Sequence, residues 1–196
     1  MRRSLSSALR LAALGLVLAC ASAGVPYKTA DLPPQAPPAQ EENQALGEVV
    51  LTMNGNARGL AWGRWRVYGA AADLTYVGEN TWGGELLGRP VRLTVANGKI
   101  TGAGVNLTLE QSGSDVTLGG TVFQRTVRIT YAPDAIRGKT ASAGPGFELR
   151  RESPDRWAGN WGPGNMLFVN MKGAAGSYPQ SLEAPQFHLI MLGLLL

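Results

Sequence analysis

Cysteine and histidine are almost absent from this chain, whose 196 residues include one of each, Cys20 and His188. A single cysteine excludes a disulfide within the chain and any metal site built from several cysteines. A single histidine excludes a site with several histidine ligands in one chain. We therefore expect neither a metal site nor a cofactor.

The chain also lacks a marked excess of positive or negative charge when its N-terminal segment is left out of the count. The chain carries 18 Lys and Arg against 14 Asp and Glu, a formal net charge of +4. Arg2, Arg3 and Arg10 lie in a segment that we expect to be removed, which leaves 15 basic residues from Cys20 onward. A chain this close to neutral offers no electrostatic surface for a polyanion, which argues against nucleic acid as a partner.

The first 23 residues have the pattern of a secretory signal. The apolar run over residues 11–19 is far shorter than the about 20 residues that a helix needs to cross a bilayer. It ends in Leu18-Ala19-Cys20, which resembles the lipobox of bacterial lipoproteins. The resemblance implies a signal peptide over residues 1–19, a lipidated Cys20 as membrane anchor, and a place in the bacterial cell envelope, at the outer membrane. Ordinary cleavage after Ala23, giving a secreted or periplasmic protein, is the alternative.

The next segment, residues 20–47, is expected to be a disordered linker. It contains five prolines between positions 26 and 38 and few large apolar side chains. This composition favours extended chain over a packed structure. Residues 48–196 have the length of a single domain.

Residues 48–196 are rich in glycine and show alternating rather than helical periodicity. Val91, Leu93 and Val95 alternate with polar residues, and Asn97-Gly98 then supplies the two positive-φ positions of a type I′ hairpin turn. Ile100 is out of phase with the apolar residues that resume at 105, which predicts a β-bulge at the intervening glycines.

Several more short alternating segments follow at a spacing of 8–12 residues, roughly eight to eleven strands in all. This pattern is typical of all-β proteins, and we expect an antiparallel meander closing into a barrel, with a β-sandwich as the second choice. The apolar run at residues 187–196 is interpreted as a buried closing strand.

Gly63-Arg64-Trp65 resembles the G-x-W element that opens the first strand of lipocalins. In that family the tryptophan closes one end of an eight-stranded barrel whose other end binds an apolar ligand. The resemblance implies the same position for Trp65 and a lipocalin-like barrel.

Two groups of aromatic and polar residues are candidates for ligand or partner contact. Trp62, Arg64 and Trp65 form the first, where an exposed indole beside arginine would make a small cationic and aromatic patch. Trp157, Asn160 and Trp161 form the second, in a segment (157–165) whose glycines and proline predict a surface loop. In the first group, arginine stems that simply cover an indole are the alternative.

Recognisable catalytic machinery is missing. The sequence has no G-x-S-x-G element, and the acidic residues lie beside turns, where solvated charge is the usual role. For His188, in an apolar segment, we expect a hydrogen-bonded structural role. The favoured function is therefore non-enzymatic: an envelope lipoprotein that binds an apolar small ligand or a protein partner. A structural or assembly component of the outer membrane is the alternative, and a hydrolase ranks below both.

Overall fold

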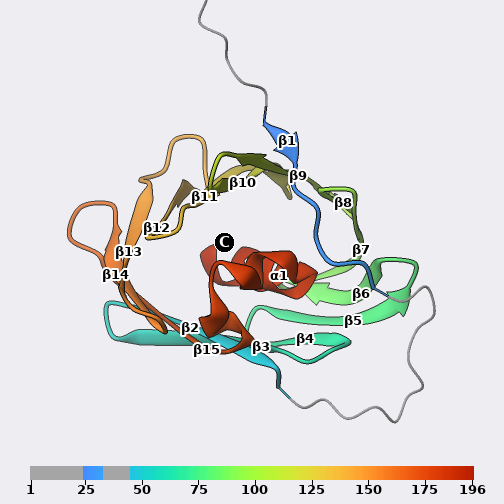
Figure 1. Ribbon diagram of the computed structural model, residues 1–196, viewed down its shortest axis with the longest axis horizontal. Helices are drawn as coiled ribbons and strands as arrows, with labels where there is room; N and C mark the ends of the chain where they lie inside the picture. The colour runs from blue at the N-terminus through green and yellow to red at the C-terminus, as the bar shows by residue number, and fades with distance from the viewer. Residues whose placement is uncertain (1–23, 33–44) are drawn as a thin grey trace, which may run out of the picture.

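The computed structural model describes residues 24–32 and 45–196, which form a closed β-barrel around a central helix (Figure 1). Residues 1–23, with Cys20, and residues 33–44, in the predicted linker, lie outside the described part. The elements in chain order are β1 (Val25–Pro26), β2 (Gly47–Met53), β3 (Asn56–Trp62), β4 (Arg66–Gly69), β5 (Ala72–Gly78), β6 (Thr81–Leu86), β7 (Arg89–Ala96), β8 (Lys99–Gly102), β9 (Val105–Ser112), β10 (Asp115–Val122), β11 (Arg125–Tyr131), β12 (Ala135–Lys139), β13 (Phe147–Ser153), β14 (Arg156–Trp161), β15 (Met166–Gly173), the 3₁₀ helices η1 (Ala174–Ser177) and η2 (Gln180–Glu183), and α1 (Pro185–Leu195).

The barrel is an antiparallel meander of 14 strands, β2 to β15. Each strand pairs with the next along the chain, and β15 closes the barrel by pairing with β2 from Leu167–Met53 to Gly173–Gly47. The predicted meander barrel is confirmed. It has more strands than the sequence pattern suggested, and more than the eight of a lipocalin.

Tight two-residue turns account for the extra strands. Asn97 and Gly98 have φ values of 52° and 68°, so the predicted type I′ turn is confirmed. Ala103 and Gly104, with φ values of 45° and 81°, form a second turn of this kind. The prediction of a bulge at these glycines is therefore wrong, because the chain reverses there and Ile100 points inward on a strand of its own.

The C-terminal run is a helix, so the prediction of a closing strand is wrong. Figure 1 shows α1 in the centre of the barrel, and all eleven of its residues are buried. The residues explain this: leucine and methionine favour helix, Ile190 is the one β-branched residue, and Pro185 occupies the first helical position. A helix that is apolar on every side has to be surrounded by protein. Among the described residues, no helix is long and apolar enough to span a membrane.

The core consists of the inward faces of the strands packed on α1. Along β7, Val91, Leu93 and Val95 point inward while Arg92 and Thr94 are exposed, as the alternation predicts. Phe187 at the start of α1 is completely buried and meets the Trp62 ring edge-on, with centroids 6.2 Å apart. The barrel is thus filled by its own helix.

Glycines in the wall let neighbouring strands curve closely around this helix. A Cβ atom on Gly159 in β14 would overlap the carbonyl oxygen of Glu148 on β13. Bends of this kind give a barrel its curvature, and only glycine fits them. The other glycines whose Cβ would overlap a neighbouring main-chain oxygen are Gly69, Gly84, Gly102, Gly120, Gly138 and Gly173.

Residues 24–32, which the sequence placed in the linker, lie against the barrel. Val25 pairs with Gln111 of β9, and the main-chain nitrogen of Tyr27 donates to Leu109 O at 2.9 Å. Ala30 N then donates to Glu183 O at 2.7 Å, and Thr29 is buried. This short segment therefore binds through main-chain hydrogen bonds, which need no run of apolar side chains.

Candidate functional site

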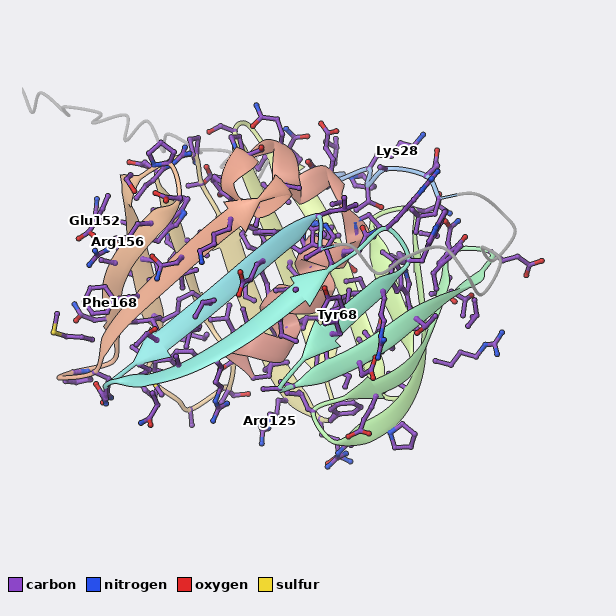
Figure 2. All side chains as sticks on the ribbon, turned by 90° about the horizontal axis from the view of Figure 1, so that it is seen from below. Lys28, Tyr68, Arg125, Glu152, Arg156 and Phe168 are labelled. Carbon is purple, nitrogen blue, oxygen red and sulfur yellow. The ribbon has the colours of Figure 1, made fainter. Side chains whose placement is uncertain are left out.

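The two ends of the barrel differ in how they are covered. At the entry end, η1 and η2 lead the chain from β15 into α1, and residues 27–32 lie over the same end. The Gln186 side chain donates to Arg64 O at 3.0 Å, which fixes the start of α1 to the β3–β4 turn. The other end, here called the far end, receives the C-terminus of α1. Figure 2 shows Lys28 toward the entry end and Arg125 toward the far end.

A cavity of about 530 Å³ opens at the far end and is here called the leucine pocket. Its floor is the last turn of α1, and its walls come from the β2–β3 turn, the β12–β13 connection and the β14–β15 turn. Its volume lies within the range of ligand pockets. The lining residues are Leu51, Met53, Asn54, Asn56, Arg58, Thr140, Pro145, Trp161, Asn165, Leu194, Leu195 and Leu196.

Hydrogen bonds between asparagines hold the rim of the leucine pocket. The Asn54 side-chain amide donates to Asn165 Oδ1 at 2.8 Å, which joins the β2–β3 turn to the β14–β15 turn. Asn165 Nδ2 in turn donates to Trp161 O at 3.1 Å. The Trp161 ring packs against Phe147, with centroids 5.3 Å apart. The rim is therefore built from fixed polar groups around an apolar floor.

A second cavity of about 300 Å³ adjoins the first through Leu196 and is here called the arginine pocket. The Arg125 guanidinium donates to Leu196 O at 3.2 Å and so binds the end of α1, where a helix presents unpaired carbonyl groups and partial negative charge. Arg89 lies over the Phe123 ring, 4.8 Å from its centroid. The lining residues are Leu87, Arg89, Val122, Phe123, Arg125 and Leu196.

The charged side chains that line the leucine and arginine pockets are all basic. Arg58 lines the leucine pocket, while Arg89 and Arg125 line the arginine pocket. No aspartate or glutamate belongs to either lining, and within the described ranges none of the three arginines has an ion pair. The far end therefore combines an apolar floor with a positive rim.

The first group of sequence candidates lies at the entry end, where its two tryptophans both pack on the core but differ in burial. Trp62 points into the barrel and is buried against Phe187, whereas Trp65 is half-buried and stacks on Tyr76 with centroids 5.5 Å apart. The Arg64 guanidinium lies 4.7 Å from the centre of the Trp65 ring. Arg64 and the half-buried Trp65 therefore make a cation–π contact.

The second group does not form a surface loop, so that prediction is wrong for residues 157–161, which form most of β14. Trp157 is completely buried, with its ring edge-on to Tyr178 at 4.8 Å between centroids. Asn160 is exposed beside Met166 on the neighbouring strand, and Trp161 lines the leucine pocket. Of the glycines in this segment, Gly159 belongs to the strand, while Gly162 and Gly164 lie in the β14–β15 turn.

His188 lies on α1 rather than on a strand, and the expected structural hydrogen bond is present. Its Nε2 is 2.8 Å from Leu182 O; a carbonyl only accepts, so Nε2 carries the hydrogen. Burial lowers the pKa of His188 to about 4, and the carbonyl opposes this shift without overcoming it. Nδ1 is buried without a hydrogen-bond partner, as is Ser181 Oγ nearby in sequence. The two groups are not hydrogen-bonded to each other, so they do not form a nucleophile and base pair.

Burial also raises the pKa values of two tyrosines that pack on Phe187, the neighbour of His188 in sequence. Tyr131 is completely buried, which raises the pKa of its phenol well above the usual value. The pKa of Tyr178 is raised mainly by burial, and its hydroxyl donates to Ala132 O at 2.6 Å. Both phenols therefore stay neutral and serve packing. In the described part of the chain, no group of three or more His, Cys, Asp or Glu side chains is arranged to hold a metal ion.

Comparison with known proteins identifies no relative: no family model matches, and neither curated proteins nor solved structures give a match. The site therefore has to be judged by its own residues. Of the sequence candidates, the structure brings only Trp161 to the leucine pocket. The sequence reasoning missed the three far-end arginines and the leucines of α1. A signal for the leucines was present, since a long apolar run rich in leucine favours helix.

Proposed function

We propose that this protein is a non-catalytic lipoprotein of the bacterial cell envelope that binds a small apolar or amphiphilic molecule in the leucine pocket. The observation that carries the proposal is the pocket itself, an apolar floor of Leu194, Leu195 and Leu196 open at the end of the barrel. The interior is filled by α1. A ligand is therefore expected at the end of the helix rather than in the middle of the barrel.

Burial of the tryptophans argues against the alternative of a structural or assembly role. That role requires an exposed aromatic surface over residues 157–165. Trp157 is completely buried and Trp161 faces the pocket rim, so neither offers a broad contact for another envelope protein. The filled interior, by contrast, is what the structural role predicts, so it is the end of the barrel and not its middle that supports ligand binding.

The position of β1 adds an orientation to the proposed anchor. Gly24 lies beside Glu110, close to the β9–β10 turn at the entry end. Three residues separate Cys20 from Gly24, so the four Cα-to-Cα steps between them span at most about 14 Å. A lipid on Cys20 would therefore hold the entry end near the membrane and present the leucine pocket to the aqueous compartment.

The anchor is tested by cell fractionation. Wild type and Cys20→Ala are expressed in a bacterial host, with Ser22→Ala as the matched control. We expect wild type and the control in the membrane fraction and Cys20→Ala in the soluble fraction. Unchanged membrane association of Cys20→Ala would show that lipidation at this residue is not the anchor.

The pocket is tested with Nile red, an uncharged apolar dye, by fluorescence titration. Met53→Arg places a charge on the rim, where Met53 is 37% exposed and can change without disturbing the core. Met166→Arg is the control, because Met166 is 57% exposed and lies outside the lining. We expect Met53→Arg to weaken dye binding at least fivefold and Met166→Arg to leave it unchanged. Equal binding by all three proteins would refute the pocket as the ligand site.

A further inference from the structure

The three far-end arginines occupy equivalent places in the barrel wall. Each stands two residues before a buried, inward-facing residue of its strand, and side chains two apart share a face. Each arginine therefore lies on the inner face, one step beyond the core. The pairs are Arg58 and Leu60 on β3, Arg89 and Val91 on β7, and Arg125 and Val127 on β11.

Of the three arginines, Arg125 is bound to the helix end, whereas Arg58 and Arg89 can bind a ligand. Arg125 is engaged with Leu196 O and with the partial negative charge of the helix end. Arg58 and Arg89 make no ion pair with a described carboxylate, and both side chains are exposed at the pocket mouths. Guanidinium groups bind carboxylate and phosphate oxygens through paired hydrogen bonds.

We propose that the ligand is an anionic amphiphile, with its apolar chain on the leucine floor and its anionic head on the arginine rim to which Arg58 and Arg89 belong. This inference rests on the proposed binding function and adds the chemical class of the ligand. Charge complementarity carries it: the two pockets meet at Leu196, and their linings contain three arginine side chains and no aspartate or glutamate. A neutral or cationic amphiphile would leave the arginine rim without a partner.

The experiment compares probes with one chain length and different heads. Laurate, dodecyl phosphate, dodecanol and dodecyltrimethylammonium compete with Nile red below their micelle concentrations. We expect the two anions to bind at least tenfold more tightly than the cation, with dodecanol between them, and this preference to shrink at high salt. Laurate against dodecyl phosphate then shows whether the head is a carboxylate or a phosphate.

Matched variants locate the charge. Arg58→Gln and Arg89→Gln are each expected to weaken laurate binding about fivefold more than the same variant weakens Nile red binding. Arg92→Gln is the control, because Arg92 is exposed on the outer wall and lines neither pocket. Arg125 is left intact because it binds the helix end.

The outcomes separate the two proposals. If Nile red binding is insensitive to Met53→Arg, the proposed binding function fails. If Nile red binds in the pocket but laurate binds no more tightly than dodecanol, the anionic ligand is refuted. It is also refuted if Arg92→Gln weakens laurate binding as much as Arg58→Gln does.

Discussion

Replacing Phe187 by alanine tests whether α1 is packed as the core of the barrel. The Phe187 side chain is completely buried and has four ring partners within 6.5 Å between centroids. Burial of this kind makes Phe→Ala cost about 3–5 kcal/mol. We expect the upper part of that range, because the hydrogen-bonded barrel wall cannot collapse into the cavity.

The control for this change is Phe168→Ala on β15. Phe168 lies on the outside of the wall, half-buried (Figure 2), with Arg156 5.3 Å from its ring centre. Loss of this exposed contact should cost about 1 kcal/mol or less.

Urea denaturation and thermal melting measure both variants. A loss of about 3–5 kcal/mol corresponds to a fall in Tm of roughly 6–20 °C for a domain of this size. If Phe187→Ala lowers the free energy of unfolding no more than Phe168→Ala does, α1 is not packed as the core of the barrel.

Two further changes test the turn and the buried histidine. Gly98→Val should destabilise the fold by about 1 kcal/mol or more, because φ is 68° and its Cβ would lie 2.9 Å from Tyr27 O; equal stability by urea denaturation would contradict this. His188 binds fewer protons folded than unfolded, because burial lowers its pKa from 6.5 to about 4. The free energy of unfolding should therefore have its full value above pH 6.5 and should fall by a few kcal/mol as the pH drops toward 4. In His188→Gln this part of the pH dependence should vanish in urea titrations, and an unchanged profile would assign it to other groups.

Alternation in the sequence was enough to predict the barrel wall. Val91, Leu93 and Val95 have a period of two, which places them on one face of a strand wherever that strand lies. The Asn97-Gly98 turn was predictable for the same local reason. Turns such as Phe123-Gln124, with φ of 47° and 71°, were not, because neither residue favours positive φ and the paired strands impose it.

The helix and the binding candidate could not be derived in this way. An apolar run of ten residues fits a buried strand and a buried helix equally by periodicity. The outcome depends on the space inside the closed barrel, which is a property of all the strands together. The far-end arginines were hidden for a related reason: Arg58 and Arg89 are 31 positions apart in sequence, and only the closed wall brings both to one end.

The place of α1 in the chain governs when the protein can fold. The helix follows every strand in sequence, yet it supplies the centre around which all of them pack. During synthesis, the strands emerge before the residues that fill their interior. Until residues 185–195 arrive, the inward faces have no partner, and the pairing of β15 with β2 would enclose an empty space. The barrel therefore completes its fold only after the helix has been synthesised, and a chain ending before residue 185 should expose its apolar faces and aggregate.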